Sequence, residues 1–73
     1  MKRIDMKRFS ELVGKIVNEH GEIQIDKLYV ELCSKHDVCP SPSYYKYYLV
    51  KMAAEMADLE YDEVEKVLRK KPK

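Results

Sequence analysis

The chain has 73 residues and a formal net charge of +1, with 45% hydrophobic and 37% charged residues. This length fits one domain, which buries about 60% of the surface that its unfolded chain exposes and leaves little room for an active site. The composition is that of an ordered protein and excludes a disordered tail. No apolar run approaches the roughly 20 residues that span a bilayer, and the start has no apolar signal-peptide stretch. We therefore expect a cytoplasmic protein with no membrane partner.

Charge is distributed unevenly along the chain. Residues 1–8 carry four bases and one acid, residues 66–73 carry five bases and no acid, and residues 53–65 carry six acids and no base. The basic ends are either solvated surface or contacts to phosphates. In the second case the contacts would include Lys2, Arg3, Arg69 and Lys70. The many Lys and Glu residues, with one Asn and one Gln, resemble the composition of hyperthermophile proteins.

The first helix is predicted over residues 6–20. Its apolar stripe has helical spacing, with Asp5 as N-cap and Gly21 just past the end. His20 lies near the C-terminus of this helix, where a positive charge suits the helix dipole. The stripe consists of Phe9, Leu12, Val13, Ile16, Val17 and His20.

The next stretch predicts a short extended segment and a second helix. Residues 21–25 read GEIQI, in which apolar and polar residues alternate, as in a very short strand or an extended link. Asp26 then fits the N-cap of a helix over about residues 27–36, whose apolar face includes Leu28 and Leu32.

A third helix is predicted over about residues 42–57. Pro40 and Pro42 prevent the second helix from continuing. Ser41 followed by Pro42 is typical of an N-cap and the first helical residue. The spacing predicts a buried face made of Tyr45, Tyr48, Leu49, Met52, Ala53 and Met56.

The segment over residues 58–70 fits two structures, of which we favour a fourth helix. Asp62 with Glu65 resembles a capping box, and the acids precede the bases as the helix dipole prefers. Val64, Val67 and Leu68 give it a short apolar stripe. The alternative is a wing-like hairpin, which would need a turn near Asp62 although no Gly is present to adopt a positive φ.

Residues 21–52 read GEIQIDKLYVELCSKHDVCPSPSYYKYYLVKM. This segment resembles the helix-turn-helix core of archaeal winged-helix regulators, which have a Gly-acid-aliphatic link, a helix opened by Asp, and a Ser-Pro-Ser start to the recognition helix. The resemblance implies that Ser41-Pro42-Ser43 opens a recognition helix and that Lys46 takes a position that is often basic. It implies DNA as the partner.

A recognition helix exposes residues near its N-terminus to base edges and phosphates. Here Ser43, Tyr44, Lys46 and Tyr47 are predicted on that exposed face, and Lys46 and Lys51 would reach phosphates or guanine edges. The exposed pair Tyr44 and Tyr47 fits three interpretations: contact with nucleic acid, contact with a protein partner, or packing against the terminal segment.

Cys33, His36 and Cys39 have the form C-x2-H-x2-C, and His20 is an additional candidate zinc ligand. Standard zinc signatures use two pairs of ligands, and Cys33 falls on the apolar face of the second helix, where a free Cys acts as a small hydrophobe. We therefore expect no metal and no cofactor. A Cys33–Cys39 disulfide is a further alternative.

We find no nucleophile beside a base and no Gly-rich phosphate loop, and we expect no enzyme. The sequence thus predicts an all-α or nearly all-α domain over residues 1–73, with a three-helix helix-turn-helix core and a fourth helix, or alternatively a winged helix. The expected function is DNA binding in regulation, replication or packaging, with possible homodimerisation through the first or fourth helix. The alternative function is a protein-interaction module, part of a larger complex, that docks through Tyr44, Tyr47 and the acidic segment 55–65.

Overall fold

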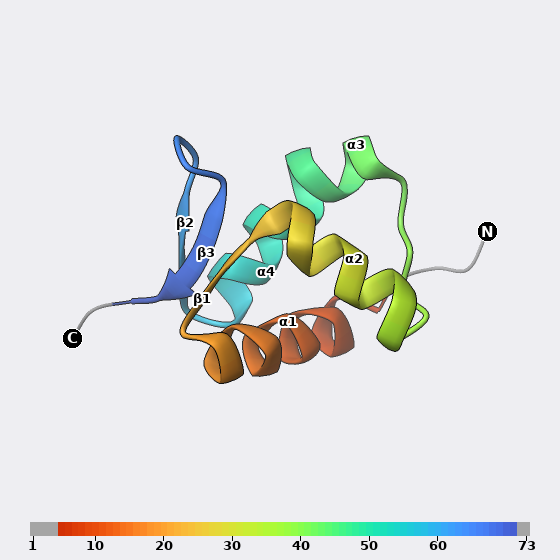
Figure 1. Ribbon diagram of the computed structural model, residues 1–73, viewed down its shortest axis with the longest axis horizontal. Coiled ribbons are helices and arrows are strands. Elements are labelled where there is room, and N and C mark those ends of the chain that lie inside the picture. Colours follow the sequence, from red (N-terminus) through yellow and green to blue (C-terminus); the bar gives the residue numbers. More distant parts are fainter. Residues whose placement is uncertain (1–4, 72–73) are drawn as a thin grey trace.

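The computed structural model describes residues 5–71 and combines helices with a small antiparallel sheet. The elements are α1 (Met6–His20), β1 (Glu22–Gln24), α2 (Ile25–Lys35), α3 (Pro42–Tyr44), η1 (Tyr45–Leu49), α4 (Val50–Met56), β2 (Leu59–Asp62) and β3 (Val67–Lys70). Because α3, η1 and α4 follow one another without a break, we call them together helix 42–56. Figure 1 shows the strands gathered at one end of the molecule, with helix 42–56 and α2 beside them.

The first helix has the predicted bounds, because both of its ends are capped. The Asp5 side chain accepts a hydrogen bond from the backbone N–H of Lys7 at 3.0 Å. At the other end Gly21 has a φ of 79° and its N–H donates to the carbonyl of Val17, a conformation that glycine adopts without steric cost. The prediction of a helix over residues 6–20 is confirmed.

The second helix begins at Ile25, earlier than predicted, and Asp26 is not its N-cap. The extended segment before it is a strand, β1. No side chain caps the start of α2. Instead, the backbone N–H of Ile25 donates to the carbonyl of Lys66 at 2.9 Å. The start of α2 is therefore joined to the segment between β2 and β3.

Helix 42–56 starts as predicted but buries a different face. Ser41 accepts a hydrogen bond from the N–H of Tyr44 at 3.4 Å, and Pro42 is the first helical residue. The π-helical turn η1 adds one residue to the helix turn, and this shifts the buried face by one position after Tyr45. Tyr48 and Met56, which were predicted to be buried, are 44% and 49% exposed. The buried residues are Tyr45, Leu49, Val50, Ala53 and Ala54.

The predicted fourth helix is wrong: residues 59–70 form a hairpin, so the domain is mixed α/β rather than all-α. The antiparallel sheet has the order β1-β3-β2, with Leu68 opposite both Ile23 and Tyr61. The pairing of β3 with β1 joins segments far apart in the sequence, which no local pattern reveals. The fourth helix, one of the two predicted dimerisation surfaces, does not exist.

The loop 63–66 between β2 and β3 shows why the helix prediction failed. The Asp62 side chain does cap the following backbone, accepting hydrogen bonds from the N–H groups of Val64 and Glu65 at 3.0 and 3.1 Å. The hydrogen bond that the Glu65 N–H donates holds the pKa of Asp62 below its usual value, and the Val64 N–H and the Arg69 guanidinium add to this effect against partial desolvation. The turn continues into a strand because Lys66 adopts a φ of 59°. The required positive φ is thus present without a glycine.

Replacing Lys66 by Gly should raise the free energy of unfolding by about 0.5 to 1 kcal/mol, because a left-handed conformation costs a residue with a Cβ more than it costs glycine. The variant keeps the backbone carbonyl of residue 66, which accepts the hydrogen bond from the N–H of Ile25. Glu65→Gly is the matched control, since Glu65 has no positive φ and this change should destabilise. Urea denaturation of both variants makes the comparison. A Lys66→Gly variant less stable than the wild type would contradict the loop conformation.

The core lies between α1, α2, helix 42–56 and the sheet, and Tyr45 is among its largest buried side chains. Tyr45 is 1% exposed, its hydroxyl donates to the carbonyl of Ile25 at 2.6 Å, and its ring centroid lies 4.9 Å from that of Tyr29. Burial, with a contribution from Asp26, raises the pKa of Tyr45 well above its usual value. The hydroxyl therefore stays neutral and fixes helix 42–56 against the start of α2.

Candidate nucleic-acid interface

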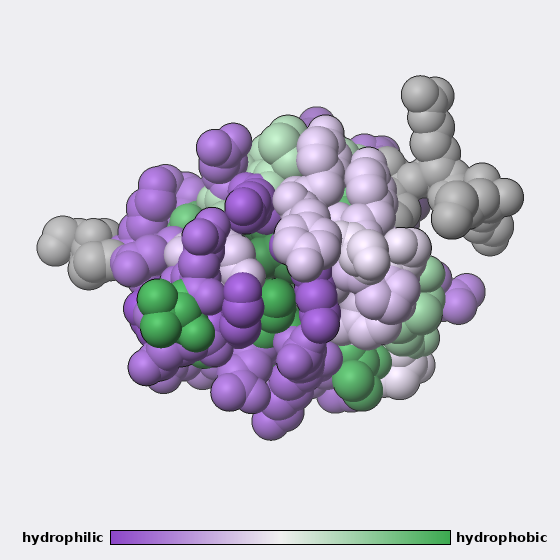
Figure 2. Space-filling view, turned by 90° about the horizontal axis from the view of Figure 1, so that it is seen from above, coloured by the Kyte–Doolittle hydropathy of each residue, from purple (hydrophilic) through white to green (hydrophobic). Residues whose placement is uncertain are grey.

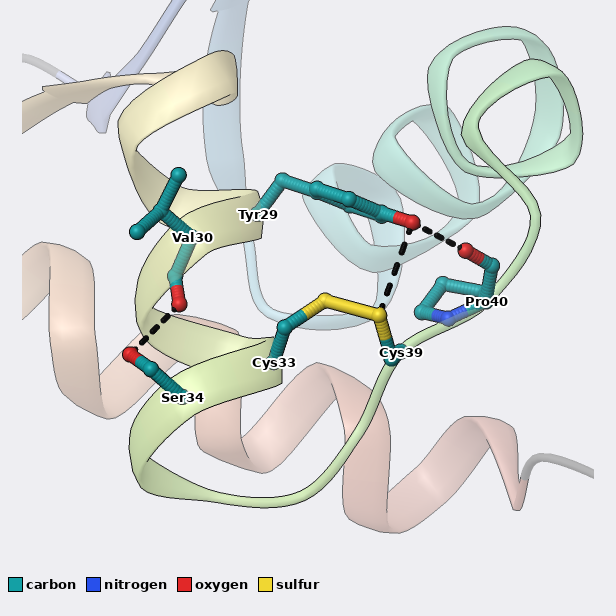
Figure 3. Close-up of a disulfide and its surroundings, with 6 residues drawn as sticks. All are labelled: Tyr29, Val30, Cys33, Ser34, Cys39 and Pro40. Carbon is teal, nitrogen blue, oxygen red and sulfur yellow. Dashed lines mark hydrogen bonds between the residues drawn. A yellow bond between two sulfur atoms is a disulfide. The ribbon is translucent and has the colours of Figure 1, made fainter.

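The loop that leads into helix 42–56 is attached to α2 by a disulfide and a hydrogen bond, shown in Figure 3. Cys33 in α2 is bonded to Cys39 in the loop. The hydroxyl of Tyr29 donates to the carbonyl of Pro40 at 2.5 Å, and the Cys39 Sγ lies 3.7 Å from the same hydroxyl oxygen. Asp37, with a φ of 54°, turns the chain at the end of α2. These links fix where helix 42–56 begins.

The zinc alternative built on Cys33, His36 and Cys39 does not hold in this structure. The two sulfurs are bonded to each other, so neither is a thiolate ligand, and His36 is exposed. His20 faces Glu31 instead, at 3.5 Å. Within residues 5–71, no group of three or more His, Cys, Asp or Glu side chains gathers to hold a metal ion.

The exposed side of helix 42–56 brings together five of the residues predicted as a nucleic-acid site. Tyr47 is 78% exposed and Tyr44 50% exposed. A sixth residue, Tyr48, belongs to this surface and was not predicted from the sequence. Its ring is parallel to that of Tyr44 within 12°, with the centroids 5.1 Å apart, and the four-residue spacing of the two tyrosines was the available indication. The five predicted residues are Ser43, Tyr44, Lys46, Tyr47 and Lys51, all exposed.

Both lysines of this surface lie beside carboxylates from neighbouring segments. Lys46 Nζ is 3.6 Å from Asp26 at the start of α2, and Lys51 Nζ is 3.4 Å from Glu63 in the hairpin loop. All four side chains are at least half exposed, so each pair contributes at most about 1 kcal/mol to stability. The lysines are therefore able to exchange these partners for phosphates at small cost.

The other predicted phosphate contacts do not join this surface. Arg69 lies on the sheet, where its guanidinium is within 4.0 Å of the carboxylates of Glu22, Glu60 and Asp62. Lys70 is exposed at the end of β3 and lines a shallow depression with Gly14 of α1 and Ala57. That depression lies beside the C-terminal end of helix 42–56, whereas Ser43 is at the N-terminal end of the same helix. Lys2 and Arg3 lie outside the described residues.

The hairpin loop beside helix 42–56 is acidic and has an apolar tip. Val64, which is 92% exposed, lies between Glu63 and Glu65 in the chain, and Asp62 at the end of β2 precedes the loop. Seen from above in Figure 2, a pale surface of intermediate hydropathy lies next to a strongly hydrophilic region. The molecular surface in this view therefore varies in hydropathy from one region to the next.

Comparisons with protein-family models, with curated proteins and with solved structures gave no match for this chain. Among the helices of residues 5–71, none has the length and apolar character needed to cross a membrane.

Proposed function

We propose that this chain is a small DNA-binding domain, related to the helix-turn-helix and winged-helix domains, that uses helix 42–56 as its recognition helix. The observation that carries the proposal is the division of this helix into two sides. Tyr45, Leu49 and Val50 fix it in the core, while Ser43, Tyr44, Lys46, Tyr47 and Lys51 face solvent. A DNA-reading helix needs both a fixed angle and an exposed polar side near its start.

The arrangement around the helix supports the proposal further. The order of elements is helix, strand, helix, helix and hairpin, with β1 paired to β3, and a hairpin beside a recognition helix is the arrangement that gives winged-helix domains their name. The Ser41 cap and the anchored loop hold the first turn in place. Such preorganisation lowers the entropy lost on binding.

The double variant Lys46→Gln/Lys51→Gln should weaken DNA binding roughly 10- to 100-fold, since hydrogen bonds to charged groups are the strong ones. The slope of the logarithm of the binding constant against the logarithm of the salt concentration should also become shallower by about 2, because two phosphate contacts are lost. Fluorescence anisotropy of labelled DNA over a salt series measures both quantities.

The matched control is Lys15→Gln/Lys35→Gln, which removes the same charge from exposed positions on α1 and α2. This control should bind like the wild type apart from the small effect of net charge. Equal losses in the two double variants would show that helix 42–56 has no special role. No binding to any DNA at low salt would contradict the proposed function.

A protein-interaction module is the second candidate, and the hairpin loop favours it. Val64 is almost fully exposed between Glu63 and Glu65, and Glu63 forms an ion pair with Lys51. A basic protein partner would pair with these carboxylates and cover Val64. Two results together would establish this candidate instead. The chain would not bind DNA, and its binding to a protein partner would be abolished by Val64→Asp but retained in Val30→Asp.

A further inference from the structure

We infer that helix 42–56 binds the unpaired bases of single-stranded DNA in preference to closed duplex DNA. This inference rests on the proposed function and specifies its substrate. It starts from the three exposed tyrosines, Tyr44, Tyr47 and Tyr48, which are 50%, 78% and 44% exposed. They lie within five consecutive residues of one helix, although a stable fold has no need to leave so much aromatic surface in water.

Two of the rings are already ordered. Tyr44 and Tyr48 stack on each other, with an interplanar angle of 12° and a centroid separation of 5.1 Å. Each ring restricts the other, so the pair loses little side-chain entropy when a further planar group is added. Tyr47, on the same stretch of helix, is the most exposed of the three. The surface therefore combines one preorganised tyrosine pair with a third, more exposed tyrosine.

An unpaired base has the chemistry that fits such a surface. Its planar π-face stacks on tyrosine whatever the base, while the bases of a duplex hide their faces in the helical stack. Lys46 lies between Tyr44 and Tyr47 in the chain, Lys51 follows Tyr48 within one helical turn, and both lysines are about half exposed. They would hold the phosphates of a strand whose bases rest on the rings. The surface thus offers both of the contacts that single-strand binders combine.

The charge of the hairpin loop disfavours a duplex. A helix seated in the major groove brings a phosphate backbone against the neighbouring hairpin, as a wing requires. Here the loop carries Glu63 and Glu65 on either side of Val64, with Lys66 as its one base, and carboxylates repel phosphates at short range. A single strand is narrower and can follow the tyrosines and Lys46, whose nearest carboxylate is Asp26 of α2. Lys51 would exchange the loop carboxylate of Glu63, 3.4 Å away, for a phosphate.

The test compares a labelled single strand with the duplex of the same sequence, by fluorescence anisotropy at low and moderate salt. The wild-type chain should bind the single strand more tightly. Tyr47→Ala should weaken single-strand binding roughly 5- to 100-fold, the range found when a base-stacking aromatic is removed, while Tyr47→Phe, which keeps the ring, should bind like the wild type. Val30→Ala, at another exposed helical position, is the control for side-chain truncation.

The outcomes separate this inference from the function on which it rests. Tighter single-strand binding that depends on the ring of Tyr47 supports both. Duplex binding equal to or tighter than single-strand binding, with Tyr47→Ala without effect, overturns the inference and leaves the DNA-binding function standing. No binding to either form removes both.

Discussion

Tyr45→Ala should lower the free energy of unfolding by about 3 to 5 kcal/mol, as expected when a fully buried aromatic ring is removed. The ring is 1% exposed and packs against Tyr29, so truncation leaves a cavity between helix 42–56 and α2. Because small domains have only about 5 to 15 kcal/mol of stability, this single change approaches the limit that the fold tolerates. Urea denaturation followed by circular dichroism measures it.

Tyr45→Phe is the companion variant, and it separates the hydroxyl from the ring. It leaves the buried carbonyl of Ile25 without the hydroxyl donor that lies 2.6 Å away and should cost about 1 to 3 kcal/mol. A Tyr45→Phe variant as stable as the wild type would show that this hydrogen bond does not join helix 42–56 to α2. Wild-type stability of Tyr45→Ala would show that the described core is wrong.

Removing the disulfide should be the second large effect. The double variant Cys33→Ser/Cys39→Ser should lose about 2 kcal/mol, because the bridge closes a short loop and short loops give the smaller stabilisations. The loss should be local as well, since the bridge attaches the loop before helix 42–56 to α2. Amide hydrogen exchange should therefore increase at residues 36–44 more than in α1.

The reduced wild-type protein is the control for this prediction. Treatment with a reductant should reproduce the exchange pattern of the double variant without changing any residue. Tyr29→Phe, which removes only the hydrogen bond to Pro40, should give a smaller change over the same residues. Unchanged exchange at residues 36–44 in the reduced protein would show that the disulfide does not hold the loop.

The helices that could be predicted from the sequence are those whose ends are marked by local contacts. Asp5 and Gly21 bound α1, and Ser41 with Pro42 opens helix 42–56. In these cases the residue at the boundary makes the hydrogen bond or adopts the φ that its type favours. A pattern of a few residues is then sufficient to locate the boundary.

The hairpin could not be predicted in the same way, because its stability comes from distant partners. β3 pairs with β1, which lies more than forty residues earlier in the chain, and this pairing places Leu68 opposite Ile23. The backbone N–H of Ile25 also donates to the carbonyl of Lys66. The cap from Asp62 is real, but a capped turn leads equally into a helix or a strand. The positive φ of Lys66 is supported by tertiary contacts that override local preference.

The sequence predicted which side of helix 42–56 is exposed only in part, and it did not predict the surroundings of that side. Helical spacing placed Tyr44, Lys46 and Tyr47 on the exposed side correctly. The π-helical turn could not be foreseen, and it moves Tyr48 from the predicted core to the surface. The carboxylates of Asp26 and Glu63 beside the lysines follow from tertiary packing alone.

Amide chemical-shift mapping by NMR tests our proposal that the exposed side of helix 42–56 is the DNA-binding surface. Isotope-labelled protein is titrated with single-stranded and then with duplex DNA, and each amide is followed by NMR. We expect the largest shift changes at residues 43–51 and smaller ones along α1. Changes centred on the end of β3 beside Lys70, or no changes with either form of DNA, would contradict it.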